Sequence, residues 1–288
     1  MKKAIIFSVG FAGRAIYRKA KDEYQIIGFI DSNKEISGSK YEGITIYCVD
    51  EINNLDFDVI LFGGIWYEEM EKQLLSLGID KNKIILVPES EIPYSTNKRE
   101  EATDEAIKKL DIFFNSKNIK YIVYGSSLIT ILRKKSLSCV TDVDLILADY
   151  KNLEFLANNL ANSFPEYNIS IKYFEKDTFT RKKGDIRQIV INDNSDEKIS
   201  FDIISMFTCG NFLVHTYVNK FIYYPKHMFD NIIRYPYKDF DLPIPKHYDE
   251  ILTALYGKDY IIPPKKWSNN DYGNIITKEE LEKLVNKK

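Results

Sequence analysis

The sequence predicts an α/β protein in which a domain built on a parallel sheet precedes a domain of α+β type. In residues 1–92, apolar strand-like runs alternate with helix-like segments, which is typical of parallel sheets. A polar stretch containing prolines, residues 88–101, then interrupts this pattern. Beyond residue 100, consecutive strands occur without helices between them. The length of 288 residues fits two domains at ~100–200 residues each.

In the first domain, residues 1–92, the strands are marked by short apolar runs. We expect strands at Lys3–Val9, Gln25–Ile30, Ile44–Tyr47, Val59–Phe62 and Lys83–Val87. We expect the helices between them at Ala12–Lys21 and Tyr67–Leu77. A helix between two consecutive strands lets the strands run in the same direction. The alternation therefore predicts a small Rossmann-like parallel sheet.

A glycine-containing turn follows the first strand of this domain. It reads Ser8-Val9-Gly10-Phe11-Ala12-Gly13, and Asp31 ends the second strand. The arrangement resembles the Rossmann dinucleotide fingerprint, which makes Gly10, Gly13 and Asp31 candidate cofactor-binding residues. Ser8 stands where the first glycine belongs, and about 90 residues provide only one mononucleotide half. A nicotinamide-dependent enzyme is therefore a weaker alternative, and glycines that only allow close helix packing are another.

Short Rossmann-like domains of this kind also occur at the front of enzymes that modify sugars in surface-glycan pathways. The resemblance lies in Ile27-Gly28-Phe29-Ile30-Asp31 and the later Gly43-Ile44. It implies that the first domain binds a nucleotide or positions an acceptor.

The second domain, residues 100–288, begins with a helix in which Ile107, Leu110, Phe113 and Phe114 recur behind Thr103 as N-cap. A strand at Ile119–Tyr124 and a helix from Gly125 to Lys135 follow. The remaining expected elements are the strand Asp142–Leu147, the helix Asn152–Asn162, the strands Ile169–Phe174, Ile186–Ile191 and Ile199–Ile204, and the helix Asp249–Tyr256 closed by Gly257.

Three aspartates lie on predicted strands of the second domain. Side chains alternate along a strand, so Asp142 and Asp144 project from one face and Val143 and Leu145 from the other. Asp202 lies on a later strand. Carboxylates that share a site raise one another's pKa, and oxygen ligands of this kind suit Mg²⁺ or Mn²⁺. We therefore expect Asp142, Asp144 and Asp202 to bind a metal and to be catalytic, with Asp202 alternatively a general base.

A strand-to-helix turn at Gly125-Ser126 offers backbone amides and a hydroxyl to a phosphate. Arg133, Arg181 and Arg187 are candidates for holding donor phosphates, whereas Lys134 and Lys135 are interpreted as solvated surface residues. The order Gly-Ser, Asp-x-Asp, Asp suits phosphoryl chemistry, which needs charge neutralisation and an activated hydroxyl.

The residues from about 105 to 270 resemble the LicD family of phosphotransferases, within the polymerase-β-like nucleotidyltransferase superfamily. The most specific part is the tail Leu242-Pro243-Ile244-Pro245-Lys246-His247-Tyr248, followed by Leu255-Tyr256-Gly257-Lys258-Asp259-Tyr260 and Pro263-Pro264. The resemblance implies a nucleotidyltransferase-type fold and transfer of a phosphorylated alcohol, such as phosphocholine, from a CDP-activated donor to a glycan acceptor. Trp267 is a candidate for stacking on the nucleotide or sugar.

Alternative functions remain at this stage. One is a nucleotidyltransferase that attacks a triphosphate and releases pyrophosphate, and another is a non-catalytic protein that binds a sugar nucleotide. A Ser126 or Ser127 hydrolase is disfavoured because no Gly-x-Ser-x-Gly motif is present. Three histidines without ligand spacing disfavour zinc.

Composition restricts partners and compartment. Forty basic and 42 acidic residues give a net charge of −2, which disfavours nucleic-acid binding driven by charge. Cys48, Cys139 and Cys209 lie far apart, so we expect reduced thiols and a cytoplasmic protein. The longest charge-free stretch, Ile203–Asn219, falls short of the ~20 apolar residues that span a bilayer. Peripheral association with glycan-assembly machinery is compatible with these features.

Overall fold

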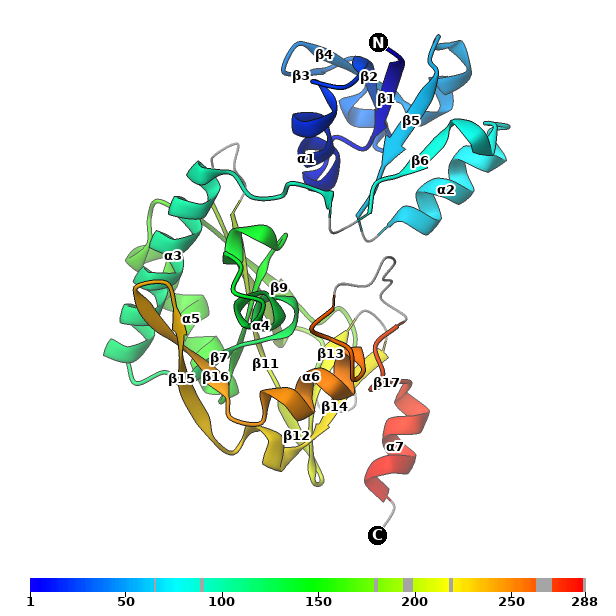
Figure 1. Cartoon of the computed structure of the whole chain (residues 1–288). Helices are drawn as coiled ribbons and strands as arrows, with labels where there is room; N and C mark the ends of the chain where they lie inside the picture. Colours follow the sequence, from blue (N-terminus) through cyan, green and yellow to red (C-terminus); the bar gives the residue numbers. More distant parts are fainter. Residues whose placement is uncertain are drawn as a thin grey trace. The chain divides into compact units, whose positions relative to one another are not determined.

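The structure is a computed structural model of the whole chain (Figure 1). It describes residues 1–64, 66–88, 91–178, 181–193, 199–217, 220–262 and 271–286. These residues fall into two compact units. Residues 1–94 form the described part of unit 1, and residues 95–262 with 271–286 form that of unit 2. Among the described residues, no helix has the length and apolar character needed to cross a membrane.

Unit 1 is built on a six-stranded sheet with the order β3-β4-β2-β1-β5-β6. All neighbouring strands run parallel except β3 and β4. The strands are β1 (Lys3–Phe7), β2 (Gln25–Asp31), β3 (Lys40–Tyr41), β4 (Ile44–Cys48), β5 (Val59–Phe62) and β6 (Ile84–Leu86). The helices are α1 (Phe11–Ala20) and α2 (Tyr67–Ser76). The mixed α/β class and the parallel sheet are thus confirmed, with every predicted element of this region present.

The two faces of this sheet are covered by different helices, as the alternation of apolar residues along β1 requires. Ala4 and Ile6 pack with Tyr17 of α1 in one core. Ile5 and Phe7 pack with Leu74 of α2 in the other. The glycine turn between β1 and α1 therefore lies at the carboxyl edge of a sheet that is buried on both sides.

The predicted boundary segment, residues 88–101, contains the point between Tyr94 and Ser95 at which the two units divide. Ile92 and Tyr94 are buried against unit 1, and the Tyr94 ring stacks on Phe11 at 5.0 Å between centroids. Helix α3 begins at Asn97, with Thr96 accepting a hydrogen bond from the Arg99 amide as N-cap. Residues 89–90 lie outside the described residues. The first unit thus extends to Tyr94, and α3 of the second unit begins within the segment.

Helix α3 (Asn97–Ser116) also corrects the expected N-cap of the second unit. Thr103 is a buried residue within the helix, and its hydroxyl donates to the Arg99 carbonyl at 2.7 Å. The error has a physical reason. The apolar periodicity starts at Ile107, but the residues before Thr103 are mostly polar helix formers that extend the helix by almost two turns.

Unit 2 contains a five-stranded sheet with the order β7-β8-β11-β10-β9. Strands β8 and β11 run parallel, and the other neighbours are antiparallel. The strands are β7 (Tyr121–Val123), β8 (Val143–Leu147), β9 (Asn168–Tyr173), β10 (Ile186–Asn192) and β11 (Ser200–Ser205). The helices are α4 (Gly125–Leu132) and α5 (Tyr150–Ser163). Together with α3 they pack around one apolar core that includes Leu110, Leu145 and Phe201.

The last third of the chain holds strands that the sequence analysis did not predict. A second sheet has the order β12-β13-β14-β17, and β15 pairs with β16 as a separate hairpin. The strands are β12 (Phe207–Cys209), β13 (Phe212–Tyr217), β14 (Lys220–Pro225), β15 (Ile232–Tyr237), β16 (Phe240–Pro245) and β17 (Ile275–Ile276). Helices α6 (Tyr248–Tyr256) and α7 (Lys278–Asn286) complete the unit. Gly257 caps α6 with φ +87°, as predicted.

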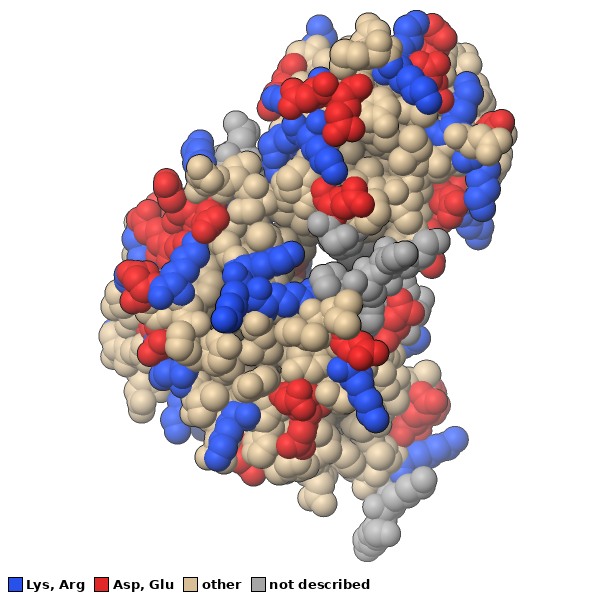
Figure 2. All heavy atoms as spheres, in the orientation of Figure 1, with Lys and Arg blue, Asp and Glu red and all other residues tan. Residues whose placement is uncertain are grey.

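The surface carries both signs of charge. Lys and Arg side chains lie among Asp and Glu side chains on both units in the view of Figure 2. This mixture agrees with the 40 basic and 42 acidic residues of the chain. A nucleic-acid-binding face normally shows a basic stripe instead, and the face in this view does not have one among its coloured residues.

Candidate active site

Three aspartates meet on the paired strands β8 and β11 of unit 2. Asp144 lies within β8 and is the pairing partner of Asp202 on β11, while Asp142 lies one residue before β8. Carboxylate oxygens from the three residues lie within 4.8 Å of one another. Val143 and Leu145 project to the opposite side and are buried in the core of the unit. The structure therefore brings together the three acidic residues named from the sequence.

The crowding of these carboxylates alters their protonation. Burial, followed by the charges of Asp142 and Asp202, raises the pKa of Asp144 well above its usual range. Burial and the charge of Asp142 raise the pKa of Asp202 to about 6. Lys172 and Arg187 oppose this shift, as does the Gln188 side-chain amide, which donates a hydrogen bond to Asp202. A divalent cation would relieve this repulsion, and carboxylate oxygens are the ligands that Mg²⁺ and Mn²⁺ prefer.

Gly125 allows the chain to pass close to one of these carboxylates. It starts α4 directly after β7 and Tyr124, with φ +59° in the left-handed region. A Cβ at this position would lie 3.0 Å from Asp144 Oδ2. The Tyr124 amide donates to the Asp144 carbonyl at 3.0 Å, which holds the turn against β8. Glycine is thus needed here both for the backbone conformation and for space.

Ser127 links the turn to the acidic strand, a role that the sequence analysis missed. Its side chain is fully buried, accepts a hydrogen bond from the Asp144 amide at 2.9 Å and donates to the Asp142 carbonyl at 3.4 Å. It therefore fixes the backbone on both sides of Val143. By contrast, Ser126 is exposed and lines the cavity in front of the aspartates. In the sequence, this role of Ser127 was indicated only by its small hydroxyl side chain two residues after Gly125.

A cavity of about 410 Å³ lies in front of the aspartates, and its two flanks differ in charge. The flank next to Asp202 carries Arg181 and Arg187. The Arg181 guanidinium lies 3.4 Å from the centre of the Tyr150 ring, a cation–π contact that orients the side chain. Positive charge beside the carboxylates gives this flank the chemistry needed to bind phosphate.

The other flank of the cavity is aromatic. Tyr217, Tyr256 and Tyr272 line it, with ring centroids 5.3 Å apart for Tyr217–Tyr272 and 5.6 Å apart for Tyr256–Tyr272. Burial is the largest cause of the raised pKa of all three phenols, and the charge of Asp144 is a smaller cause in each case. His215 also lines the cavity, and burial lowers its pKa to about 4, so it is neutral at pH 7. This flank offers rings and hydroxyls without a full positive charge.

Arg133 does not lie among the residues that line this cavity. It caps the end of α4 and donates to the carbonyls of Ile261 at 2.8 Å and Tyr260 at 2.6 Å. Its guanidinium therefore holds the segment after α6 by hydrogen bonds. This position does not favour the role expected from the sequence, which was to bind donor phosphates. Pro263, Pro264 and Trp267, which the sequence analysis also named, lie outside the described residues.

In unit 1, the Val9 and Gly10 amides of the predicted binding turn already donate hydrogen bonds to side chains of the same unit. Asp31 accepts from the Val9 amide at 3.0 Å and from the Asn33 amide at 2.9 Å. The Gly10 amide donates to Ser8 Oγ at 3.0 Å. Amides of this turn are the groups that would contact a phosphate. The geometry thus favours a structural role for Gly10 and Asp31.

Gly13 and Ser8 show how this turn departs from the fingerprint. A Cβ on Gly13 would lie 1.8 Å from the Ser8 carbonyl oxygen, so Gly13 is needed for α1 to pack against the turn. Ser8 replaces the first glycine and retains a left-handed backbone at φ +73°. A cavity of about 260 Å³ lies beside the turn, lined by Ser8, Asp31 and Trp66 among others.

A family model matches a region of the chain that lies within unit 1. Residues 1–85 match the family described as C2185-like, N-terminal. No curated protein matches the chain. Among solved structures, UDP-D-quinovosamine 4-dehydrogenase from Vibrio fischeri is 21% identical, with 30% of this chain and 78% of that chain covered and a TM-score of 0.27.

Two further structures are similar at the same low level. The lincosamide antibiotic adenylyltransferase LnuA is 14% identical, with 53% of this chain and 82% of that chain covered and a TM-score of 0.33. RSP, a Rex-family repressor, is 16% identical, with 41% and 64% covered and a TM-score of 0.25. Values this low assign neither a fold nor a function to this chain.

Proposed function

We propose that this protein is a metal-dependent transferase that moves a phosphoryl-alcohol group, such as phosphocholine, from a CDP-activated donor to a sugar hydroxyl of a surface glycan. The observation that carries the proposal is the meeting of Asp142, Asp144 and Asp202 within 4.8 Å, beside a cavity with arginines on one flank. The choice of donor and acceptor depends on the LicD-like tail. Because Cys48, Cys139 and Cys209 are free thiols, we place the reaction in the cytoplasm.

The roles of the residues follow from their positions. Asp142, Asp144 and Asp202 would hold Mg²⁺ or Mn²⁺, and a metal bound there polarises the attacked phosphate and neutralises the departing nucleotide. Asp202 lies closest to the basic flank and alternatively accepts the proton of the attacking hydroxyl. Arg181 and Arg187 bind donor phosphates, and the exposed Ser126 at the start of α4 adds a hydroxyl and an amide.

The difference between the two flanks supports an orientation for the substrates. Phosphates are attracted to the flank with Arg181 and Arg187, next to Asp202. The flank with Tyr217, Tyr256 and Tyr272 provides rings and hydroxyls, which suit an alcohol group or a sugar ring. A donor bound in this way would present its phosphorus atom in front of the aspartates, between the two flanks.

A thermal-unfolding experiment with CDP-choline tests the proposal without knowledge of the acceptor. A ligand that binds the folded state at 100 times its Kd adds about 2.7 kcal/mol to the free energy of unfolding. We expect CDP-choline to raise the Tm in the presence of Mg²⁺ and not in its absence. Asp144→Asn should abolish this shift. Asp31→Asn, which changes the aspartate of the unit 1 turn, should leave it intact and is the matched control.

Other outcomes identify the competing functions. A Mg²⁺-dependent shift with CTP or ATP alone, together with pyrophosphate release, would replace the proposal with nucleotidyl transfer, because the same acids suit attack on an α-phosphate. A metal-independent shift with UDP-sugars, or no metal binding at all, would favour a non-catalytic binding protein. Activity that persists in Asp144→Asn would refute the assigned site.

A further inference from the structure

Asp142 differs from the other two aspartates in how its backbone is held. Asp144 and Asp202 lie within β8 and β11 and are fixed by the hydrogen bonds of paired strands. Strand β8 begins at Val143, so Asp142 lies just outside this pairing. Its backbone is held by the Ser127 hydroxyl, which donates to the Asp142 carbonyl at 3.4 Å, and by the segment 136–141, which leads from α4 into β8. What holds this segment therefore contributes to where the Asp142 carboxylate lies.

Arg99, in the first turn of α3, makes the main contacts with this segment. The side chain is 2% exposed. Its Nε donates to the Ser138 carbonyl at 2.9 Å, and one terminal nitrogen donates to the carbonyls of Val140 at 3.0 Å and Thr141 at 3.4 Å. The Thr141 hydroxyl in turn donates to the Asp142 carboxylate. A chain of contacts thus leads from the guanidinium to the candidate metal ligand.

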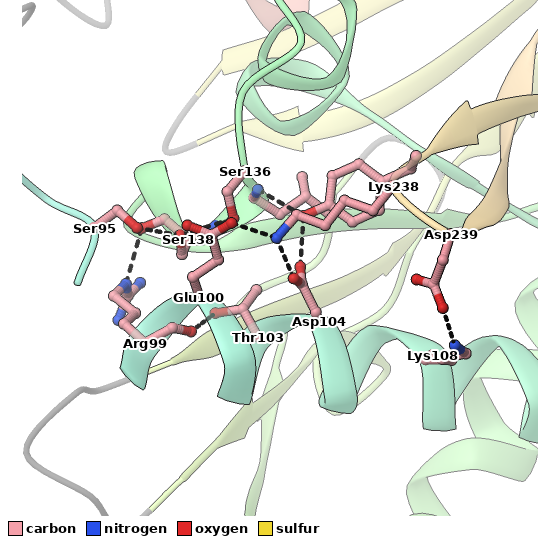
Figure 3. Close-up of polar contacts among 12 residues, drawn as sticks. Ser95, Arg99, Glu100, Thr103, Asp104, Lys108, Ser136, Ser138, Lys238 and Asp239 are labelled. Atoms are coloured by element: carbon pink, nitrogen blue, oxygen red, sulfur yellow. Dashed lines mark hydrogen bonds and ion pairs between the residues drawn. The ribbon is translucent and has the colours of Figure 1, made fainter. Parts of the chain in front are cut away.

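Further polar contacts connect the same segment to Ser95, to α3 and to the hairpin β15–β16 (Figure 3). Ser95 and Ser138 share a hydrogen bond between their hydroxyls. The Tyr237 hydroxyl accepts from the Leu137 amide at 3.0 Å and donates to Asp104 of α3 at 2.7 Å. Lys238, next to Tyr237, forms ion pairs with Glu100 and Asp104. The segment before Asp142 is therefore clamped between α3 and the hairpin β15–β16.

We propose that Arg99 is a positioning residue for the candidate metal site, in that it holds the segment 138–141 so that Asp142 faces Asp144 and Asp202. The inference rests on the proposed function, since it requires a cation at the three aspartates. A buried guanidinium provides several donors in one plane, which matches three carbonyls of a turning chain. Lysine has a flexible point charge and reproduces this arrangement only in part.

A Mn²⁺ titration followed by electron paramagnetic resonance tests the inference through binding rather than activity. Groups that orient metal ligands typically contribute 10–100-fold to metal affinity. We expect Arg99→Met to weaken Mn²⁺ binding by about this factor and Arg99→Lys to lie between Arg99→Met and the wild type. If Arg99→Met does not fold, Arg99→Lys carries the test.

Asp111→Asn provides a control on the same helix. Asp111 is a buried residue of α3 that pairs with Arg234 at 2.8 Å and accepts from the Tyr121 hydroxyl at 2.7 Å. The substitution should lower the Tm without a change in Mn²⁺ affinity. A purely structural Arg99 would behave in the same way, so a lower Tm with unchanged Mn²⁺ affinity in both Arg99 variants would overturn the inference.

Hydrogen exchange in the metal-free protein separates failure of this inference from failure of the proposed function. The amides of Cys139 and Val140 donate to the carbonyls of Ser136 and Leu137 within the clamped segment. We expect Arg99→Met to accelerate their exchange more than that of the β8 amides. If the wild type binds no Mn²⁺, the proposed function fails. If the exchange of Cys139 and Val140 is unchanged, the positioning role of Arg99 fails.

Discussion

Units 1 and 2 contain the same local pattern with opposite outcomes. Each has a strand, a glycine turn and a helix, with an aspartate on a neighbouring strand. In unit 1, Asp31 accepts hydrogen bonds from the Val9 amide of the turn and from the Asn33 amide after β2. In unit 2, Asp144 faces Asp142 and Asp202, and burial with the neighbouring charges raises its pKa. The acid is therefore bonded to the turn in unit 1, whereas in unit 2 it faces two other acids.

The two units also differ in how their aspartates affect the free energy of unfolding. The Asp31 side chain stabilises unit 1, because it accepts hydrogen bonds from two backbone amides. The aspartates of unit 2 repel one another and lower the stability of the metal-free fold. Repulsion that persists in a folded protein is typical of functional sites. Substitutions that remove an acid should thus have opposite effects on the two units.

The largest effect on stability is expected for Asp202→Asn in metal-free protein. The folded-state pKa of Asp202 is about 6, against about 3.9 in an unfolded chain. Between these values the folded state retains the proton and the unfolded state does not. The free energy of unfolding of the wild type therefore falls as the pH rises through this window, and the penalty is complete above pH 6.

Asp202→Asn lacks this penalty. The variant should be more stable than the wild type by roughly 3 kcal/mol at pH 7, at about 1.4 kcal/mol per pKa unit, and equal to it below pH 4. Urea unfolding at pH 4, 5, 6 and 7 measures the difference. A variant that is less stable than the wild type at pH 7 would contradict the view that these acids repel.

A smaller effect is expected for Gly125→Ala in unit 2. Its left-handed backbone at φ +59° costs an alanine about 1–2 kcal/mol. The new Cβ would also displace the Asp144 carboxylate, 3.0 Å away, so Mn²⁺ affinity should fall. Gly10→Ala in unit 1 should cost less than ~0.5 kcal/mol, because Gly10 has φ −66° and its Cβ meets only the movable Ser8 hydroxyl.

Gly43→Ala separates the two contributions at Gly125. Gly43 has φ +82° and open space around a Cβ, so its substitution reports backbone strain alone. Thermal unfolding and Mn²⁺ titration of the three alanine variants measure the effects. Equal Mn²⁺ affinity in Gly125→Ala and Gly43→Ala would show that the close approach to Asp144 has no role in metal binding.

Of the two substitutions that remove an acid, the smaller effect is expected for Asp31→Asn in unit 1. An asparagine keeps one acceptor oxygen, so one of the two backbone hydrogen bonds from Val9 and Asn33 is lost. The cost should be about 1 kcal/mol, with the opposite sign to Asp202→Asn. Thermal unfolding at pH 7 measures it. If Asp31→Asn stabilised the protein, Asp31 would resemble the unit 2 acids, and the contrast between the units would be lost.

Local patterns in the sequence predicted most of the elements that position the site. The period of two along β8 placed Asp142 and Asp144 on one face, with Val143 in the core. The strand at β11 was also predicted from its own residues. Its pairing with β8, which brings Asp202 to Asp144, is a long-range contact that follows from the assembled sheet. Individual strands were therefore visible in the sequence, and the distances between the aspartates were not.

Long-range contacts account for the residues that the sequence analysis misjudged. Arg133 bonds to Tyr260 and Ile261, which lie 127 and 128 residues away, and Arg99 bonds to a segment about 40 residues away. The hairpin β15–β16 was missed because Pro236 and Pro243 argue against strands. This hairpin has only two strands, so a proline is accommodated wherever its missing amide faces outward.

The position of β11 has a consequence for the order of folding. Strand β11 follows β9 and β10 in the chain but lies between β8 and β10 in the sheet. The polypeptide must therefore be made as far as Ser205 before the centre of this sheet closes, and Asp144 meets Asp202 only at that step. The long stretch of chain between β8 and β11 closes slowly, because bringing its two ends together costs more chain entropy than closing a local turn. A nascent chain that ends before β11 would have two of the three aspartates and no complete acidic site.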